Sequence, residues 1–315
     1  MNTAIKVVVV GSINMDLVIR TAHLPVPGET VLGDDYLTYP GGKGANQGVA
    51  AAKLGAQTTI IGAVGTDAFG AELVDNLTHH GVKTDAVIRK QNTASGIALI
   101  AVEEKTKENT IIVSGGANRR LTAQDISAAA AAIQNADILI CQLEIPIEAV
   151  ETALIIARQH AVITLLNAAP ARQLSDSLLK LVDILVVNET EAMQLSEYGI
   201  DELEDIEQAS AVLMGKGIGS IVITMGGKGA NVVDTDHRIY VPAFPVKVID
   251  TVGAGDAFAG AYAVAIARGS SLADALKYAN AVGALATTKS GAQSGSPTAA
   301  EVETFLARFS NKDFV

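Results

Sequence analysis

The sequence predicts an α/β protein with a doubly wound, mostly parallel sheet, helices on both faces and a small extra β-sheet. Short β-branched runs such as 7–10 are apolar at nearly every position, which is typical of strands buried on both faces. These runs alternate along the chain with longer helical patterns, as in folds whose parallel strands are joined by helices. Two segments, 14–40 and 95–114, break the alternation and predict the extra sheet.

The expected elements follow one another in chain order. The apolar runs expected to form strands are 7–10, 58–62, 138–143, 162–167, 184–188 and 220–224. The longer segments expected to form helices are 44–54, 68–79, 122–135, 146–160, 190–195, 206–214 and 257–268. Because ligands in such folds bind beyond the carboxyl ends of the strands, the loops that follow the strands are the expected place for a site.

Neither of the two exceptional segments contains a helical pattern. Segment 14–40 combines prolines and glycines with alternating apolar residues, and segment 95–114 has the pattern of a hairpin with a charged turn at 103–108. Strands without covering helices predict a small sheet that closes over an active site as a lid, although a pair of irregular excursions would also fit. Because an uncovered apolar face needs a partner, we expect a homodimer formed through the lid, with residues 1–315 as a single domain.

Composition excludes several classes of function. The 315 residues carry a net charge of −11, which argues against binding to nucleic acid or to an anionic membrane surface. The single cysteine, Cys141, excludes an internal disulfide framework, and its apolar surroundings predict a buried, inert thiol. No apolar stretch reaches the roughly 20 residues that span a bilayer, and no signal peptide precedes the first strand, so we expect a soluble, cytoplasmic protein.

The most informative motif is the glycine-rich stretch 250–256, which a small-residue helix follows at once. Gly253 and Gly255 allow backbone N–H groups to crowd together at the helix start, and such a start binds anions. Asp256 lies inside this anion site, where a carboxylate is a poor ligand for phosphate. It is well suited to act as the base for a hydroxyl that attacks a phosphoryl group. An ordinary glycine turn capped by an acid is the alternative.

A second glycine motif, 41–47, opens an alanine-rich helix. Its glycines allow the backbone to approach a ligand closely. Lys43 supplies a positive charge, and Asn46 supplies an amide that can donate to and accept from a hydroxyl. The motif is not a P-loop, because neither Ser nor Thr follows the lysine, and Gln47 replaces the third glycine of a dinucleotide-binding fingerprint.

Polar side chains follow two of the strands. Asn14 and Asp16 come after the first strand and share a face, which suits neighbouring hydroxyls of a sugar or an ordinary transition into a loop. Asn188 and Glu191 follow the strand at 184–188. Glu191 is placed to hold Mg²⁺ through water, although an acid near a helix start is also favourable by itself.

Taken together and in this order, these segments resemble the ribokinase-like carbohydrate kinase family over nearly the whole chain. The two signature regions of the family correspond to 41–47 and 250–256, and its Asn-x-x-Glu element corresponds to 188–191. Further similar stretches are 27–30, 115–118, 167–172 and 289–293.

The resemblance implies an ATP-dependent kinase that phosphorylates the 5-hydroxyl of D-ribose, with Mg²⁺ as cofactor and K⁺ as activator. Asp256 is then the base that also contacts the sugar, and the N–H groups of Gly253, Ala254 and Gly255 form the anion hole. The other implied sugar contacts are Asn14, Asp16, Gly42, Lys43, Asn46 and Glu144. The implied ATP-site residues are Asn188, Thr224, Gly226, Gly229, Gly255 and Asn280. The implied ligands of the monovalent cation, mostly through carbonyls, are Asp250, Val252, Ala286, Lys289, Gly291 and Gly295.

One departure from the family pattern concerns the cation. Gly295 stands where the family often has serine, so a side-chain ligand is missing and the expected affinity for the cation is reduced.

Other functions stay open at this point. The acceptor can instead be 2-deoxyribose, another aldose or ketose, or a nucleoside, although the aromatic content of 4% leaves little surface for stacking a base. A non-catalytic sugar-binding regulator is the alternative from another class. The presence of Asp256, Lys43 and Glu191 argues against it, because a pure binder needs no base.

Overall fold

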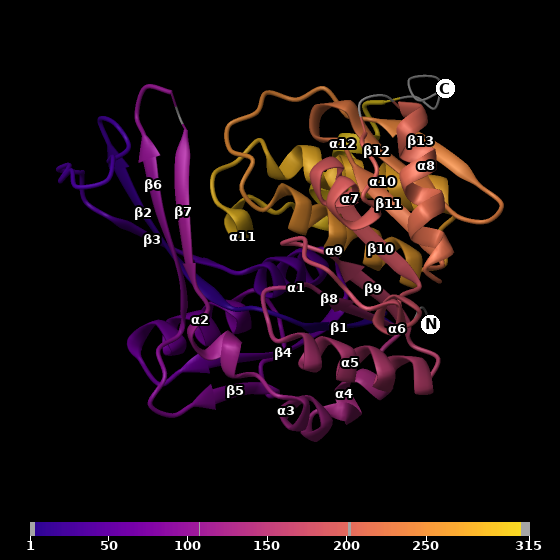
Figure 1. Cartoon of the computed structure of the whole chain (residues 1–315), viewed down its shortest axis with the longest axis horizontal. Helices are drawn as coiled ribbons and strands as arrows, with labels where there is room; N and C mark the ends of the chain where they lie inside the picture. The colour runs from indigo at the N-terminus through magenta and orange to yellow at the C-terminus, as the bar shows by residue number, and fades with distance from the viewer. Residues whose placement is uncertain (1–3, 107, 201–202, 310–315) are drawn as a thin grey trace.

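The computed structural model describes residues 4–106, 108–200 and 203–309. Most of its strands belong to one large sheet. These strands are β1 (Lys6–Val10), β4 (Gln57–Gly65), β5 (Val87–Lys90), β8 (Ile138–Cys141), β9 (Ile163–Asn167), β10 (Ile184–Asn188), β11 (Ser220–Thr224), β12 (Gly229–Val233) and β13 (Arg238–Pro242). Their order across the nine-stranded sheet is β13-β12-β11-β10-β9-β8-β1-β4-β5 (Figure 1).

All neighbouring pairs from β5 to β11 are parallel, which confirms the predicted sheet. The strands β12 and β13 extend it in antiparallel fashion. They were not among the expected strands, because a glycine-rich turn and short apolar runs hide them in the sequence. The expected strand at 138–143 is shorter than predicted and ends at Cys141.

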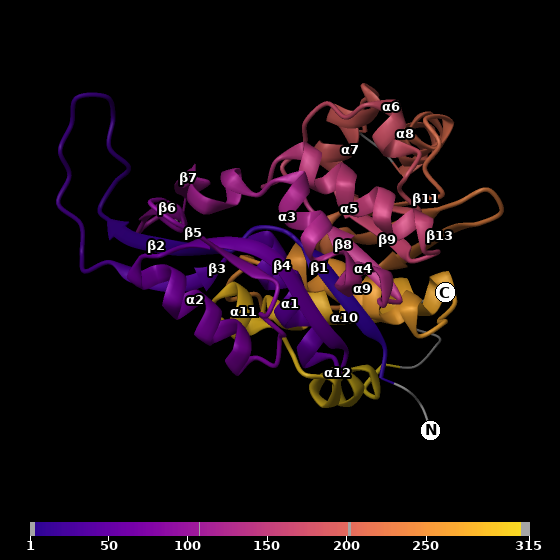
Figure 2. The same ribbon diagram turned by 90° about the horizontal axis from the view of Figure 1, so that it is seen from below.

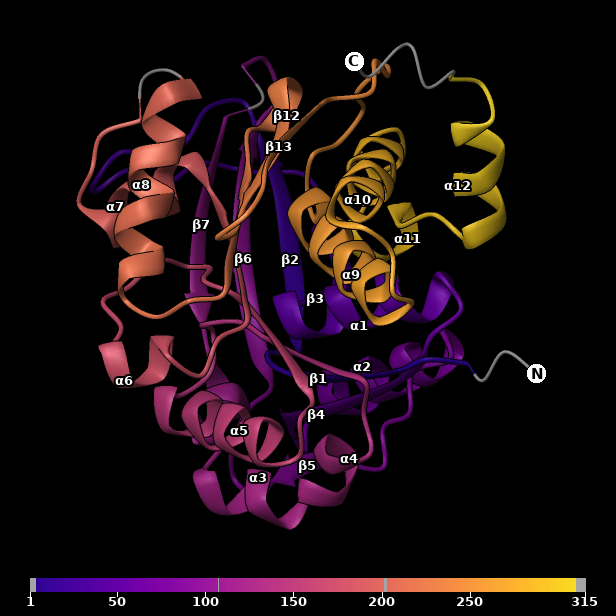
Figure 3. The same cartoon turned by 90° about the vertical axis from the view of Figure 1, so that its right-hand side faces the viewer.

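Helices cover both faces of the large sheet (Figure 3). Those on one face are α1 (Lys43–Lys53), α2 (Ala68–His79), α9 (Ala254–Ala267), α10 (Leu272–Ala286) and α12 (Ala299–Leu306). Those on the other are α3 (Ala123–Ala128), α4 (Ala130–Gln134), α5 (Ile147–Gln159), α6 (Asp176–Leu179), α7 (Glu189–Ser196) and α8 (Leu203–Gly215). The strands serve both layers, since Val7 and Val9 of β1 join the first core whereas Val8 and Val10 join the second.

Two predicted helices differ from the structure. The helix expected at 122–135 is divided into α3 and α4 at Ala129, whose backbone leaves the helical region. The hydroxyl of Ser127 donates to the carbonyl of Ala123 within α3, a contact that weakens a helix from inside. The helix expected at 257–268 begins at Ala254, so Asp256 lies in its first turn.

A smaller sheet stands at one end of the large one (Figures 1 and 2). Its strands are β2 (Asn14–Thr21), β3 (Leu37–Gly41), β6 (Gly96–Glu103) and β7 (Asn109–Ser114), in the order β3-β2-β6-β7. The extra sheet predicted from 14–40 and 95–114 is therefore confirmed; residue 107 of the expected charged turn lies outside the described residues. The connection between β2 and β3 extends away from the rest of the molecule (Figure 2). Ile111, Ile112 and Val113 of β7 are each more than half exposed.

The single cysteine lies in the core of the large sheet. Cys141 is buried, as predicted, and burial raises the pKa of its thiol. The helix α9 is buried over most of its length, because its composition is apolar on all sides. No helix in the described residues is long and apolar enough to cross a bilayer.

A close crossing of α1 and α9 brings the two glycine motifs together. A Cβ atom added at Gly260 of α9 lies 2.9 Å from the carbonyl oxygen of Gln47 and 3.0 Å from the Cβ atom of Ala50. Only glycine permits this approach without displacing α1. The crossing therefore places residues 46 and 47 of α1 beside the first turn of α9.

This packing predicts that the same substitution has opposite effects at two helical glycines. Gly260→Ala forces α1 and α9 apart and should lower the free energy of unfolding by about 1–3 kcal/mol. Gly283→Ala in α10 is the matched control, because its added methyl group reaches only ordinary contact distances, 3.6 Å from the nearest atoms. It should raise stability by about 0.5–1 kcal/mol. Urea denaturation measures both, and equal stabilities would contradict the close crossing.

Candidate active site

The first turn of α9 holds a buried carboxylate between two amides of α1. Asp256 is 7% exposed. Its Oδ2 atom accepts a hydrogen bond from Nδ2 of Asn46 at 2.9 Å, and its Oδ1 atom accepts one from Nε2 of Gln47 at 2.9 Å. The two glycine motifs therefore meet, although Asn46 and Asp256 are 210 positions apart. The carboxylate is oriented by both oxygens at the start of a helix, where the dipole favours negative charge.

Gly253 forms the N-cap of α9 and has a φ of 75°, a region that favours glycine. A Cβ atom added at Gly253 would also collide with Ala292, so no side chain fits there. The N–H groups at such a helix start lack i−4 partners and face outward. One expected anion-hole donor is already engaged, since the N–H of Ala254 donates to the carbonyl of Thr251 at 3.2 Å.

Charged side chains gather around Asp256: the carboxylates of Asp16, Glu144 and Glu191 and the ammonium of Lys43. Burial raises the pKa of Asp16 from its usual 3.8 to about 7, and the nearby carboxylates of Glu144 and Asp256 add to the effect. Burial lowers the pKa of Lys43, but Asp256, Glu144 and Glu191 outweigh it, so its pKa is raised. The sequence-predicted Asp16, Lys43, Glu144 and Asp256 are thus electrostatically coupled. A charged cluster in which the pKa values of Asp16 and Lys43 are shifted is typical of a functional site.

Glu144 is tied to both motif segments. Its Oε2 atom accepts a hydrogen bond from the hydroxyl of Ser12 at 2.6 Å and one from the backbone N–H of Lys43 at 3.3 Å. Gly42, the N-cap residue of α1, accepts a backbone hydrogen bond from Asn46 at 2.8 Å. These contacts hold the start of α1 against the end of β1.

Asn14 and Asp16 lie at the start of β2, opposite Gly41 and Tyr39 of β3. Asn14 is buried, and its Oδ1 atom accepts a hydrogen bond from Nδ2 of Asn118 at 2.7 Å. The small sheet therefore supplies Asn14 and Asp16, two of the residues predicted to contact the sugar.

Two of the residues expected at a nucleotide, Asn188 and Thr224, end the neighbouring strands β10 and β11. Asn188 and Glu191 form a capping box at α7, in which the Oδ1 atom of Asn188 accepts from the N–H of Glu191 at 2.8 Å. The Oε2 atom of Glu191 accepts from the N–H of Asn188 at 2.9 Å. Burial raises the pKa of Glu191 despite the opposing effects of this hydrogen bond and of Lys43. The favourable helix start that was the alternative for these residues is thus present, and Glu191 still lies within the electrostatic reach of Lys43.

The remaining nucleotide-site candidates are less closely joined to the cluster. Thr224 ends β11, Gly226 opens a short 3-10 turn, and Gly229 begins β12. Asn280 is buried in α10, and its Nδ2 atom donates to the carbonyl of Val241 at 2.9 Å. Its amide nitrogen therefore fixes α10 to β13.

The residues expected around a monovalent cation come from two segments, 250–252 and 286–295, which a hydrogen bond between Gly291 and Asp250 joins. The carboxylate of Asp250 accepts hydrogen bonds from the N–H groups of Val252 at 3.0 Å and Gly291 at 2.9 Å. The carbonyl oxygens of Ala286 and Lys289 face Gly295, 3.1 and 3.3 Å from the position of an added Cβ atom. Two carbonyls and a carboxylate near one turn are the oxygen donors that a hard cation requires.

Several buried amides in the site carried no role in the sequence-based predictions. Gln47 was noted only for not being glycine, yet it bridges Asp256 and the Oδ1 atom of Asn167 at 3.0 Å. Asn118 holds Asn14, and Gln293 donates to Asn46 at 3.1 Å. The only signal available was that each lies in a stretch resembling the family.

Comparison with known proteins gives a consistent result. The model of the pfkB family carbohydrate kinases matches residues 4–299. The ribokinase of Haemophilus influenzae is 39% identical over 298 residues, which span 95% of this chain and 97% of that protein. The deoxyribokinase of Salmonella typhi is 36% identical and covers 96% of this chain and 98% of its own length. The structure of Arabidopsis thaliana ribokinase complexed with ribose and ATP has a TM-score of 0.90 at 32% identity, and the match covers 98% of this chain and 100% of that chain.

The raised pKa of Asp16 predicts a dependence of stability on pH. Between its usual pKa of 3.8 and its folded pKa of about 7, the folded protein holds a proton that the unfolded chain has released. The free energy of unfolding of the wild type therefore falls as pH rises through this window. Asp16→Asn lacks this proton, so its stability relative to the wild type should increase from about pH 5 to about pH 8.

Urea denaturation at both pH values measures the difference. Asp75→Asn on the exposed side of α2 is the control, and its difference from the wild type should be the same at both. If the Asp16→Asn difference were equally constant, the proton would not be held by Asp16.

Proposed function

The chain belongs to the pfkB family of carbohydrate kinases, and we propose that it transfers the γ-phosphoryl group of ATP to the 5-hydroxyl of D-ribose. The observation that carries this proposal is the buried Asp256, held by Asn46 and Gln47 in the first turn of α9. Full-length similarity to ribokinases and the likeness to a ribokinase with bound ribose and ATP support the choice of substrates.

In the proposed reaction, Asp256 takes the proton of the 5-hydroxyl while that oxygen attacks the γ-phosphorus. The bond from the γ-phosphorus to the β,γ-bridging oxygen breaks, and ADP leaves. Charge that develops on the transferred group faces the N–H groups at positions 253–255, and Lys43 adds a full positive charge. Because the N–H of Ala254 donates to the carbonyl of Thr251, we assign the contact with this charge to the N–H groups of Gly253 and Gly255.

The sugar pocket in this proposal lies between the small sheet and α1. Asn14 and Asp16 approach from β2, Gly42, Lys43 and Asn46 from α1, and Glu144 from the loop after β8. Carboxylates and amides that converge from separate elements suit a ligand with several hydroxyls, each of which donates and accepts. The four-stranded sheet then serves as the lid over the sugar.

The proposed ATP site comprises Asn188, Thr224, Gly226, Gly229, Gly255 and Asn280. When bound, Mg²⁺ would neutralise the phosphates. Glu191 suits it through water, because a carboxylate is a hard oxygen donor and one of its oxygens is anchored to the backbone of Asn188. A cytoplasmic location fits an ATP-dependent enzyme and stays a prediction.

Exposed apolar residues on both faces of the lid support a homodimer. Ile112 and Leu99 are paired across β7 and β6 on one face and are 62 and 42% exposed, and Ile111 and Val113 on the opposite face are each 53% exposed. Adjacent exposed apolar residues on a sheet favour burial against a second copy. Sedimentation equilibrium of the wild type and of Ile112→Asp tests this, since a monomeric wild type would contradict the proposal.

The substrate assignment is tested by ATP consumption with ribose, 2-deoxyribose, fructose and adenosine as acceptors. We expect the highest kcat/KM for ribose. A higher value for 2-deoxyribose would favour the second candidate, for which the similarity to a deoxyribokinase is the specific observation. No phosphorylation of any acceptor would leave a non-catalytic sugar-binding protein.

Two carboxylates of the site should respond differently to substitution. Asp256→Asn removes the base and should lower kcat by about 10²–10⁴-fold while leaving the dissociation constant of ATP nearly unchanged. Asp16→Ala removes an acceptor for sugar hydroxyls and should raise the KM of ribose by about 10–100-fold. Steady-state kinetics and ATP titration separate the two. Turnover near the wild-type rate in Asp256→Asn would remove this residue from the mechanism.

The carbonyl-lined turn predicts activation by K⁺. Replacing K⁺ by tetramethylammonium should lower turnover, and adding K⁺ should restore it. Gly295→Ser places a hydroxyl beside the carbonyls of Ala286 and Lys289 and should lower the K⁺ concentration that gives half-maximal activity. Turnover that is independent of K⁺ in both proteins would contradict a cation site at this turn.

A further inference from the structure

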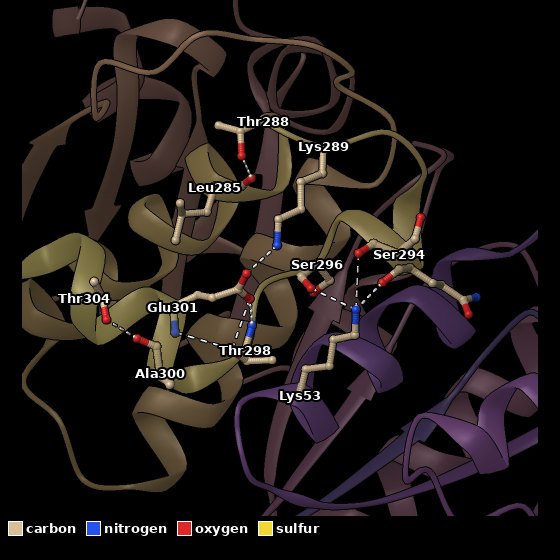
Figure 4. Close-up of polar contacts among 11 residues, drawn as sticks. Lys53, Leu285, Thr288, Lys289, Ser294, Ser296, Thr298, Ala300, Glu301 and Thr304 are labelled. Carbon is tan, nitrogen blue, oxygen red and sulfur yellow. Dashed lines mark hydrogen bonds and ion pairs between the residues drawn. The ribbon is translucent and has the colours of Figure 1, made fainter.

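Lys53, the last residue of α1, donates hydrogen bonds to a short helix that lies outside both glycine motifs. The Nζ atom of Lys53 donates to the carbonyl oxygens of Gln293 at 2.7 Å, Ser296 at 2.9 Å and Ser294 at 3.4 Å (Figure 4). These carbonyls belong to α11 (Ala292–Gly295) and the residue after it. An ammonium that donates to several carbonyls of one turn fixes that turn more firmly than a single neutral hydrogen bond.

The side chain of Gln293 connects this turn to Asp256 through Asn46. Gln293 is 4% exposed. Its Nε2 atom donates to Oδ1 of Asn46 at 3.1 Å, and Nδ2 of Asn46 donates to Asp256 at 2.9 Å. Its own Oε1 atom accepts from Nδ2 of Asn76 at 2.6 Å. The donors therefore run in one direction, from Asn76 through Gln293 and Asn46 to Asp256.

This direction determines which end of each amide faces its neighbour. Because Asn76 donates to Gln293, the nitrogen of Gln293 must face Asn46. Because Gln293 then occupies the oxygen of Asn46, the nitrogen of Asn46 faces Asp256. Reversal of any one amide would place two acceptors or two donors against each other inside a buried site.

We propose that Gln293 and Lys53 are positioning residues for the phosphoryl-transfer step. Gln293 sets the amide orientation of Asn46 so that it donates to Asp256, and Lys53 holds the backbone from which Gln293 reaches it. The inference rests on the proposed kinase function and assigns to that site two residues outside the expected set.

Burial and a neighbouring lysine disfavour the ammonium form of Lys53, and its carbonyl partners counter that effect. Burial, and secondly the charge of Lys289, lower the pKa of Lys53, while Glu301 opposes them. Lys289 itself points toward Glu301, with its Nζ atom 2.6 Å from Oε1 (Figure 4). The three carbonyls compensate the half-buried charge of Lys53.

The same short helix also touches the start of α9. Ala292, next to Gln293, lies against Gly253, whose added Cβ would stand 2.7 Å from the α-carbon of Ala292. A displacement of α11 would therefore reach both the amide that holds Asp256 and the residue that caps its helix. This double contact explains why a lysine 10 positions beyond Lys43 can affect the reaction without touching a substrate.

Replacing Gln293 by an acceptor tests the orientation directly. In Gln293→Glu the new carboxylate cannot donate to Asn46, so in either orientation the oxygen of Asn46 faces a carboxylate, that of residue 293 or that of Asp256, and the hydrogen bond that orients Asp256 is weakened. We expect kcat to fall about 100-fold, because misplacement at the reacting group has effects of this size. The dissociation constant of ATP should stay unchanged. Gln293→Met, which neither donates nor accepts, should lower kcat less, by about tenfold. Gln134→Glu on the exposed side of α4 carries the same charge change and should have wild-type kinetics.

Substitutions of Lys53 test whether its hydrogen bonds to α11 matter for the reaction. Lys53→Met should lower kcat about tenfold, and Lys53→Arg, which keeps charged donors, should restore most of it. Lys216→Met is the matched control, since Lys216 also donates to a backbone carbonyl, that of Leu195 at 2.9 Å, but far from the site. Thermal melting of every variant separates loss of fold from loss of rate.

The outcomes distinguish this inference from the proposed function. A wild type that phosphorylates ribose together with a Gln293→Glu variant of unchanged kcat would overturn the positioning role alone. Equal losses in Lys53→Met and Lys53→Arg would overturn the role of Lys53. A wild type without kinase activity on any sugar would overturn the proposed function instead.

Discussion

The site depends on keeping a charged carboxylate buried and pointed in one direction. An isolated carboxylate at the depth of Asp256, which is 7% exposed, would cost several kcal/mol. The amides of Asn46 and Gln47 and the start of α9 offset this cost. Because both amides belong to α1, the crossing of α1 and α9 is set by this polar contact as well as by apolar packing. Gly260 makes the crossing close enough for the hydrogen bonds to form.

The large sheet and the glycine motifs could be predicted because each has a signal within a few neighbouring residues. Buried parallel strands such as β1 and β10 are apolar throughout, and a glycine pair before an acid, as at Gly253 and Gly255, has few structural explanations. The antiparallel strands β12 and β13 lack such a signal. Both are short, and β12 begins at a glycine; β12 pairs with the edge that β11 provides, and β13 then pairs with β12. Their pairing is a property of the folded sheet and not of their own sequence.

The amide network could not be predicted for a different reason. Gln47, Asn118 and Gln293 are uncharged, and an amide is equally at home on an exposed surface. Their contacts join positions far apart in the chain, such as Gln293 and Asn46, separated by 247. Which amide meets which is decided by the topology that brings α1, α11 and the start of α9 together. The charged residues Asp16, Lys43 and Asp256 could be chosen in advance because their chemistry restricts where they can be buried.

The electrostatics of the site favour binding of a sugar and oppose binding of phosphates unless positive charge accompanies them. Burial, and secondly the charges of Glu144 and Asp256, raise the pKa of Asp16 to about 7. Sugar hydroxyls donate to carboxylates and stabilise their ionised forms, so a bound sugar favours release of the proton from Asp16. A nucleotide brings further negative charge to the same region of a protein whose net charge is −11. Lys43 and the start of α9 are the chain's own counter-charges there, and a divalent cation with the phosphates supplies the rest. The acceptor hydroxyl then lies between a carboxylate already satisfied by two amides and an electropositive helix start, which is the arrangement that proton removal and phosphoryl transfer together require.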